Sequence, residues 1–349
     1  MRKHTALALA AILCLSLFGG CSNESNSQSS KAAGSSAATT SQAASSASSQ
    51  ASSGDKIRIA GLKGPTSMGL VKLMNDSEEG KAKNSYEFTM AGAADEITPK
   101  LIKGELDMAA VPANLASVLY SKTQGKVEVL AVNTLGVTYI VENGTSINSV
   151  ADLKGKTIYG TGKGSIPEYA LRFVLKKNGI DPDKDVKLEW KSEPTEVVAL
   201  MGQQKDVVAM LPQPYVTVAA GNVENFREAL SITDEWSKQD KESKFITGVL
   251  VARKDFVESN KDAVKSFMEE YEASIKFAND NVDEAAALVG KYDIVKEQVA
   301  KKALPKCNIT FIAGDEMKTA LTGFYKVLFD LAPESIGGAL PNEDFYYKP

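Results

Sequence analysis

The chain is nearly devoid of histidine, and this absence excludes a large share of enzyme and metal chemistry. Its 349 residues include one histidine, His4, and three cysteines. His4 and Cys14 fall in a leader that we expect to be removed, and Cys21 is an expected lipid site. Cys307 is then the remaining thiol of the mature chain, so we expect no internal disulfide. Histidine-based triads and zinc sites built from histidine and cysteine are excluded by the same count.

The chain also lacks a long basic stripe beyond its first residues. Lys and Arg total 40 against 44 Asp and Glu, and the formal net charge is −4. We therefore expect no nucleic-acid partner. The length suits about two domains, and the hydrophobic content of 43% is ordinary for a soluble protein.

The one long hydrophobic run lies at the start of the chain. Arg2 and Lys3 precede an apolar core over residues 6–18, and Gly19 and Gly20 follow it before Cys21. The run is too short and wrongly flanked to span a membrane, so it predicts a secretory signal over residues 1–20. It resembles a bacterial lipoprotein signal, which implies that Cys21 becomes the lipidated, palmitate-bearing first residue. The protein would then be anchored to the cell membrane on its extracytoplasmic face; the alternative is plain cleavage and release.

Residues 21–54 cannot build a core. They are almost wholly Ser, Ala, Gln, Thr and Asn, a composition typical of disordered linkers. We expect a flexible, passive tether between the lipid and a folded part that begins at residue 55.

The folded part opens with a strand, a turn and a helix. Alternating residues 56–60 predict the strand, Gly64 and Pro65 the turn, and the apolar spacing over 68–74 the helix. Thr66 or Ser67 would be its N-cap. The loop therefore leads to backbone N–H groups at a helix start, which favour a negative or strongly polar group.

The same pattern recurs along the chain. Further strands are expected at 86–90, 106–111 and 127–132, each followed by a turn or a helix. Strands that alternate with helices predict a mainly parallel sheet, with ligand loops at the carboxyl ends of its strands.

Two stretches carry a family resemblance. Gly104-Glu105-Leu106-Asp107 precedes a small apolar strand that ends at Pro112, and Ser149-Val150-Ala151-Asp152-Leu153-Lys154-Gly155-Lys156 follows later. Both are similar to phrases in solute-binding proteins of bacterial ABC importers, in the nitrate, sulfonate, taurine and thiamine-precursor branch. The second resembles the phrase that opens the second lobe of those proteins. The resemblance covers about residues 55–330.

The resemblance implies an α/β fold of the type II periplasmic-binding-protein kind, with a ligand cleft between two lobes. Residues 55–135 and 248–349 would form lobe 1, and residues 136–247 would form lobe 2. Two crossing segments would join them, near 133–136 and 246–249. Pro112 and Pro212 would then occupy equivalent positions in the two lobes.

The glycine-rich turn at 161–167 excludes two sharper motifs. A P-loop needs glycine at position 157 and Ser or Thr at position 164, but these residues are Thr157 and Gly164. A dinucleotide-binding fingerprint needs glycine at position 165, which is Ser165. What remains is a loop with backbone donors and one cation, Lys163, suited to a small polar or anionic ligand.

The expected cleft gathers loops from both lobes. Its predicted ligand-binding residues are Thr66, Ser67, Met68, Gly69, Gly92, Ala93, Asn114, Asn133, Thr134, Thr161, Gly162, Lys163, Gly164, Ser165, Ile166, Thr195, Gln213 and Tyr215. No catalytic residue, cofactor or metal is assigned.

The ligand stays open between two classes. Lys63 and Lys163 favour an anion such as a sulfonate, nitrate or carboxylate. Acidic and aromatic residues also lie near the expected loops: Glu168, Tyr169, Glu193, Glu196 and Tyr215. The aromatic rings could instead stack on a pyrimidine-like ring. Implied partners are the small ligand and the permease and ATPase subunits of an importer, and we expect a monomer.

Two other functions compete. One is an enzyme like the yeast pyrimidine synthase for thiamine, which shares the fold family but uses a histidine and a cysteine-rich motif that this mature chain lacks. Carboxylates such as Asp95 and Glu96 could do acid–base work, although capping or solvated roles are the simpler expectation. The other is a sensory or adhesive lipoprotein.

Overall fold

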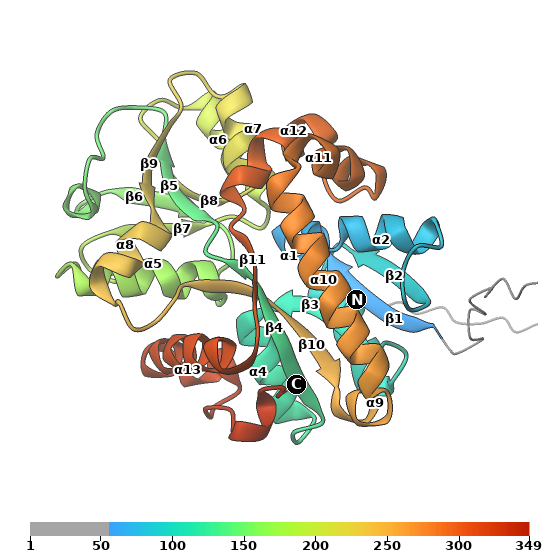
Figure 1. Ribbon diagram of the computed structural model, residues 1–349. Coiled ribbons are helices and arrows are strands. Elements are labelled where there is room, and N and C mark those ends of the chain that lie inside the picture. Colours follow the sequence, from blue (N-terminus) through green and yellow to red (C-terminus); the bar gives the residue numbers. More distant parts are fainter. Residues whose placement is uncertain (1–55, 349) are drawn as a thin grey trace, which may run out of the picture. The chain divides into compact units, whose positions relative to one another are not determined.

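The computed structural model describes residues 56–348 (Figure 1). The expected signal segment, Cys21 and the tether over 21–54 lie outside the described residues. None of the helices within 56–348 has the length and apolar character needed to cross a membrane.

The first sheet collects strands from two distant parts of the chain. Its order is β11–β4–β10–β3–β1–β2. β1 runs parallel to β2 and β3, while β10 runs antiparallel to β3 and β4. These strands are β1 (Ile57–Leu62), β2 (Tyr86–Ala91), β3 (Met108–Pro112), β4 (Val127–Leu135), β10 (Ile246–Arg253) and β11 (Ile309–Ile312). The carboxyl ends of β1 and β3 therefore lie at one edge of the sheet.

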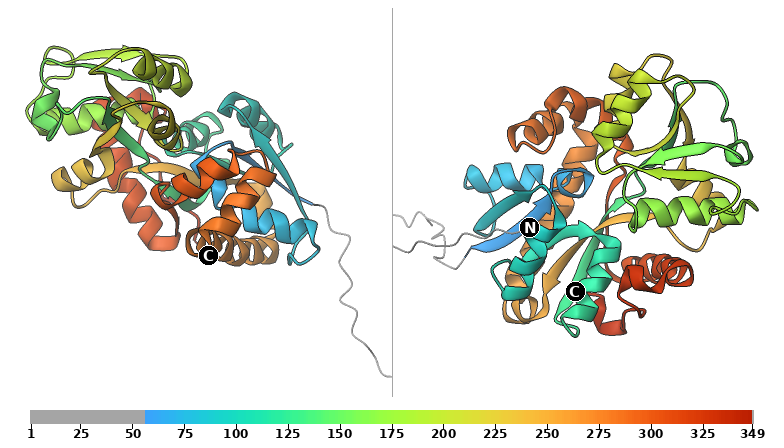
Figure 2. Two further views of the ribbon diagram at one scale, coloured as in Figure 1. Left: turned by 90° about the horizontal axis from the view of Figure 1, so that it is seen from above. Right: turned by 180° about the vertical axis from the view of Figure 1, so that it is seen from behind.

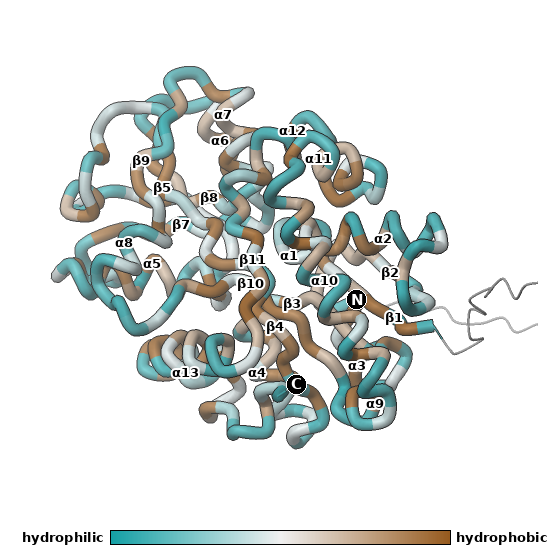
Figure 3. Tube along the Cα trace, viewed as in Figure 1, coloured by the Kyte–Doolittle hydropathy of each residue, from teal (hydrophilic) through white to brown (hydrophobic). Residues whose placement is uncertain are grey.

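Alternating side chains bury both faces of this sheet. Ala109 and Val111 of β3 belong to one core with helices α4 and α13, whereas Met108 and Ala110 belong to another core with α2 and α10. The central strands are predominantly hydrophobic (Figure 3), as expected for strands that helices cover on both faces. The helices of this half are α1 (Pro65–Met68), α2 (Val71–Glu78), α3 (Ala94–Lys103), α4 (Ala113–Lys122), α9 (Lys254–Ser259), α10 (Lys261–Asp280), α11 (Val282–Lys291), α12 (Glu297–Ala303) and α13 (Gly314–Leu331).

The second sheet repeats the arrangement of the first. Its order is β7–β6–β8–β5–β9, with β6 parallel to β7 and β8 and with β5 antiparallel to β8. Pro112 ends β3 and Pro212 ends β8, and each pairs with the antiparallel neighbour of its sheet. The strands are β5 (Thr138–Glu142), β6 (Thr157–Gly160), β7 (Lys187–Trp190), β8 (Val208–Pro212) and β9 (Arg227–Ser231). The helices are η1 (Val150–Leu153), α5 (Ile166–Lys177), α6 (Pro194–Gln203), α7 (Tyr215–Asn222) and α8 (Ile232–Gln239).

Two stretches of chain lead from one sheet to the other, as Figure 2 shows from two further directions. Residues 136–137 connect β4 to β5, and residues 240–245 connect α8 to β10. Asn308, just before β11, donates its side-chain amide to Gly136 O on the first of these stretches. The short helices of the C-terminal part are η2 (Leu304–Lys306), η3 (Pro333–Ile336) and η4 (Glu343–Phe345). The lobe bounds expected from the sequence stay a prediction.

The start of the first ligand loop differs from the sequence expectation. Thr66 and Ser67 do not cap a helix. Gly64 is the N-cap of α1, and Pro65 is its first helical residue. Proline suits that position because it has no N–H to leave unpaired. Thr66 and Ser67 therefore lie inside a helical turn.

The long helix α10 buries one face. Val264, Phe267, Tyr271 and Ile275, spaced three or four residues apart, are buried. Asn260 separates α10 from α9. The short strands β9 and β11 have no counterpart in the sequence interpretation.

Candidate functional site

Ser67, on the turn that follows β1, carries a buried hydroxyl with no hydrogen-bond partner. Its side chain is 0% exposed, and Ser67 Oγ bonds to no described residue. Glycine at position 61 makes room for it, because a Cβ there would lie 2.1 Å from this oxygen. Buried polar groups in folded proteins are nearly always paired, so an exception of this kind marks a place where a further group can bind.

Asn133, near the end of β4, links that turn to the first crossing segment. Asn133 Nδ2 donates to Thr66 O at 3.3 Å, and Thr134 Oγ1 donates to Asn133 Oδ1 at 3.0 Å. Both residues are buried. The structure thus brings four predicted site residues together, since Ser67 adjoins Thr66 on α1.

Gly248 brings β10, the strand that follows the second crossing segment, to the same place. A Cβ on Gly248 would lie 2.4 Å from Thr66 Cγ2 and 2.6 Å from Asn133 Oδ1. Its neighbour Thr247 has a buried Oγ1 without a partner among the described residues. The sequence interpretation did not assign either residue, although Thr-Gly is a polar interruption of an otherwise apolar strand and is the signal that could have found them.

Gln213, directly after β8, contributes an unpaired donor from the second sheet. Its side chain is 1% exposed; Oε1 accepts a hydrogen bond from Thr217 Oγ1 at 2.9 Å, but Nε2 has no partner in the described chain. The backbone N of Gln213 donates to Val137 O at 2.9 Å, which ties it to the first crossing segment. Because an amide nitrogen can only donate, a group that pairs with Nε2 must offer an acceptor.

The predicted donors of the loop after β2 are already engaged. The backbone N–H groups of Gly92 and Ala93 both donate to Glu96 Oε1, at 3.0 and 2.9 Å. Glu196 accepts from Glu193 N in the same way at the start of α6. The capping role expected for such carboxylates is confirmed. The backbone N–H groups of Gly92 and Ala93 are therefore not free to bind a ligand.

The glycine-rich loop after β6 is also satisfied by its own residues. Ser165 Oγ donates to Gly162 O at 2.6 Å, and Gly164 N donates to Glu168 Oε2 at 2.7 Å. Glu168 is buried and accepts a further bond from Arg172 Nε at 2.8 Å. Thr161 is buried and Lys163 is exposed. No described contact joins this loop to Ser67 or Asn133.

The remaining predicted residues have structural surroundings. Asn114 Nδ2 donates to Ser335 O at 3.3 Å, in the C-terminal part. Met68 and Ile166 lie in hydrophobic cores, and Tyr215 is half-buried against one. Gly69 packs closely on Ile275 and Ile309, where a Cβ would clash at 2.7 Å. Thr195 is exposed.

The two lysines that favoured an anion differ in their surroundings. Lys63 forms an ion pair with Asp293, whereas Lys163 has no ion-pair partner among residues 56–348. Glu168 forms an ion pair with Arg172. Burial raises the pKa of Tyr169, and Glu334 and Glu168 raise it further. In the described part of the chain, no group of three or more His, Cys, Asp and Glu side chains is arranged to hold a metal.

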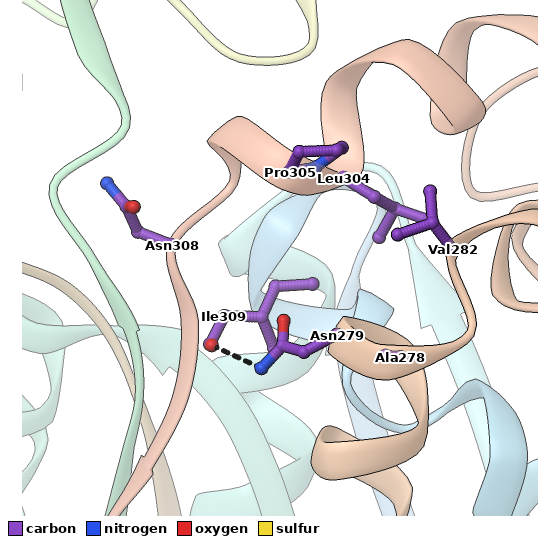
Figure 4. Close-up of a pocket in the computed structure, with 7 residues that line it drawn as sticks. All are labelled: Ala278, Asn279, Val282, Leu304, Pro305, Asn308 and Ile309. Carbon is purple, nitrogen blue, oxygen red and sulfur yellow. Dashed lines mark hydrogen bonds between the residues drawn. The ribbon is translucent and has the colours of Figure 1, made fainter.

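A pocket of about 390 Å³ opens beside the crossing segments (Figure 4). Asn279 Nδ2 donates to Ile309 O at 2.9 Å across its floor, and Ile309 also pairs with Thr134 of β4. The pocket is lined by Ala278, Asn279, Val282, Leu304, Pro305, Asn308 and Ile309. The pocket therefore adjoins the buried residues Thr66, Ser67, Asn133 and Thr134, but none of the predicted site residues lines it.

Comparison with known proteins gives one family match. The family model described as NMT1/THI5 like matches residues 101–285, just over half of the chain. Proteins of Brucella abortus and Brucella suis that carry a binding-protein name are 28% identical over 174 residues. That match covers 50% of this chain and 52% of each relative, so the chain spans about half the length of the curated relatives it matches.

Solved structures extend the likeness to most of the chain. An ABC transporter protein from Parabacteroides distasonis superposes with a TM-score of 0.71 at 20% identity, over 84% of this chain and 99% of that one. The periplasmic aliphatic sulphonate binding protein of Escherichia coli gives 0.69 at 17% identity, over 85% and 93%. The periplasmic nitrate-binding protein of Synechocystis PCC 6803 gives 0.55 at 12% identity, over 80% and 84%. At these identities the likeness establishes the fold.

Proposed function

The chain belongs to the NMT1/THI5-like family and has the type II periplasmic-binding-protein fold, and from that premise we propose that it is the solute-binding component of an ABC importer. It would capture a small polar or anionic molecule and deliver it to the permease and ATPase subunits. The sulphonate- and nitrate-binding neighbours support this role. Sulfonates, nitrate and thiamine precursors are the ligand classes to examine first.

One observation carries the proposal. Ser67 Oγ and Gln213 Nε2 are buried polar atoms without partners among the described residues; Ser67 follows β1 of the first sheet, and Gln213 follows β8 of the second. Thr247 Oγ1, on β10, is a third such atom. Ligand pockets in proteins combine apolar walls with a few convergent polar groups of this kind.

We propose lobe bounds as the sequence implies them, with residues 55–135 and 248–349 in lobe 1 and residues 136–247 in lobe 2. Closure about residues 136–137 and 240–245 would bury the ligand between Ser67 of one lobe and Gln213 of the other. Binding in the cleft then needs no covalent chemistry. We expect the protein to return a bound solute unchanged, and recovery of altered solute over several turnovers would overturn this.

We also propose that Cys21 carries a lipid that holds the receptor on the extracytoplasmic face of the cell membrane. Cys21→Ser should release the protein from the membrane fraction or block its processing. A variant that is processed normally and still sediments with membranes would contradict the anchor, without bearing on the binding function.

A thermal-shift screen of the purified folded part tests the function. Aliphatic sulfonates, nitrate, carboxylates, amino acids and pyrimidines form the panel, and binding of one class should raise the melting temperature in a concentration-dependent way. A panel without any shift, for a protein that melts cooperatively, would favour the sensory or adhesive alternative.

A further inference from the structure

Three segments that are far apart in the sequence meet at Asn133. α1 contributes Thr66, β10 contributes Gly248, and Asn133 itself lies near the end of β4. The side chain of Asn133 is 1% exposed. It therefore lies between the two strands next to the connections, since β4 leads into residues 136–137 and β10 follows residues 240–245.

Both polar atoms of the Asn133 side chain already have partners within the chain. Nδ2 donates to Thr66 O, and Oδ1 accepts from Thr134 Oγ1. This orientation of the amide is the one that satisfies both contacts, because a backbone carbonyl can only accept. Asn133 also lies against the buried phenol of Tyr271 on α10, where it partly offsets the rise in the pKa of Tyr271 that burial causes.

Close packing makes the contact sensitive to small movements. Gly248 approaches so near that a Cβ would lie 2.6 Å from Asn133 Oδ1 and 2.4 Å from Thr66 Cγ2. A shift of β10 at Gly248 must therefore move Asn133, Thr66 or both. Ser67 follows Thr66 directly, so its buried hydroxyl moves with them.

We propose that Asn133 is a positioning residue that couples β4 and β10, the strands on the first-sheet side of the two crossing segments, to the turn carrying Ser67. It does not touch the solute; it sets the place of the groups that do. The inference rests on the proposed solute-binding function, and it assigns to Asn133 a role different from the direct contact that the sequence predicts. Loss of the amide would loosen α1 and weaken solute binding together.

Asn143 provides a matched control from the second half of the chain. It is also buried, its Nδ2 donates to Met201 O at 2.7 Å, and its Oδ1 accepts from Val207 N at 2.7 Å. These bonds join the end of α6 to the start of β8, away from the crossing segments. Asn143→Asp and Asn133→Asp each place a carboxylate oxygen opposite a backbone carbonyl, so both should lower stability.

Hydrogen exchange in the solute-free protein tests the coupling without any ligand. In Asn133→Asp, the amides of Met68, Gly69 and Leu70 should exchange about tenfold faster than in wild type, because local opening becomes easier. In Asn143→Asp they should exchange at the wild-type rate. Equal rates in wild type and Asn133→Asp, or equal acceleration in both variants, would overturn the proposal.

Calorimetric titration with ethanesulfonate supplies the second arm. Asn133→Asp should weaken its binding by about five- to tenfold, as expected for one displaced hydrogen-bonding group, while Asn143→Asp binds as wild type does. Unchanged affinity in Asn133→Asp would refute the positioning role. Failure of wild type to bind ethanesulfonate would reject the sulfonate class alone, because the exchange arm still decides the coupling.

Discussion

The loops that follow β1 and β6 are both glycine-containing turns into helices, yet they treat their polar atoms in opposite ways. After β1, Ser67 Oγ is buried and unpaired. After β6, Ser165 Oγ donates to Gly162 O, and Gly164 N donates to the buried carboxylate of Glu168. A sequence pattern can indicate backbone donors at a helix start, but a single internal acceptor decides whether they are available to a ligand.

Two buried carboxylates extend the comparison between the halves. On β5 of the second sheet, burial acts to raise the pKa of Glu142, but hydrogen bonds from Ser146, Ile147 and Arg227 outweigh it and lower the pKa. On β4 of the first sheet, burial raises the pKa of Glu128 to about 7, and the nearby Lys254 offsets only part of this. Burial is common to both residues, so the hydrogen-bond donors around each carboxylate decide whether its pKa is raised or lowered.

Glu142→Ala should produce the largest effect. It leaves the partly buried Arg227 guanidinium without its carboxylate and removes the acceptor of two backbone N–H groups. Loss of one partner of a buried pair costs about 3–5 kcal/mol. Urea unfolding measures this, with Asp280→Ala in the exposed Lys276 pair as a control that should cost about 1 kcal/mol or less. Equal losses would mean that the Glu142 network contributes nothing beyond a surface pair.

Glu128 should give the next largest effect, as a pH dependence. Its folded pKa of about 7 exceeds the usual 4.5, so the folded state holds the proton more tightly than the unfolded state. The stabilisation is complete below about pH 4.5 and is lost as the pH rises through about 7, by at most about 3 kcal/mol. Glu128→Gln should flatten the unfolding free energy over this window. Parallel profiles for the variant and wild type would contradict the raised pKa.

The lowered pKa of Glu142 predicts the opposite slope. Its contribution is present above the unfolded pKa and is lost as the pH falls through the folded value. In the Glu128→Gln background, this loss on the acid side is no longer superimposed on the contribution of Glu128.

Gly248→Ala should cost less, about 1–3 kcal/mol, because a methyl group would overlap Thr66 and Asn133. Gly202→Ala is the matched change in the second half. Nothing lies within 4 Å of a Cβ there, and it is on helix α6, so it should gain up to about 1 kcal/mol. Denaturant midpoints measure the stability of both variants. A Gly248→Ala variant as stable as wild type would show that β10 packs loosely against Thr66 and Asn133.

Ser67→Ala and Ser165→Ala should give the smallest effects and separate the two loops most finely. Ser67→Ala removes a hydroxyl with no partner in the chain, so stability should hold while solute binding weakens by about 0.5–1.5 kcal/mol. Ser165→Ala loses its bond to Gly162 O and should lower stability by about 1 kcal/mol with little effect on binding. If Ser165→Ala weakened binding and Ser67→Ala did not, the ligand would bind at the loop after β6 and not at the loop after β1.

The alternation of strands and helices was enough to predict the α/β class, because apolar or alternating runs bounded by turns recur along the chain. The site was harder. Thr66, Ser67 and Asn133 were predicted from loop position, and the structure brings them together. Gly248 was missed because its role arises from packing against Thr66 of α1, which lies far earlier in the chain. Its neighbour Thr247 was missed with it. Nothing in the sequence shows that Glu96 and Glu168 occupy the donors of the other loops.

Gln213 offers the most direct test of the solute-receptor account, because its unpaired Nε2 can only donate, whereas the unpaired hydroxyls of Ser67 and Thr247 can also accept. Gln213→Leu keeps the side-chain size and removes that donor. Calorimetric titration of the best solute from the screen should show one site per chain in wild type and about five- to tenfold weaker binding in Gln213→Leu, with melting unchanged beyond the loss of the Thr217 contact. Equal affinity in the two proteins, or no solute bound by a folded wild type, would contradict the account.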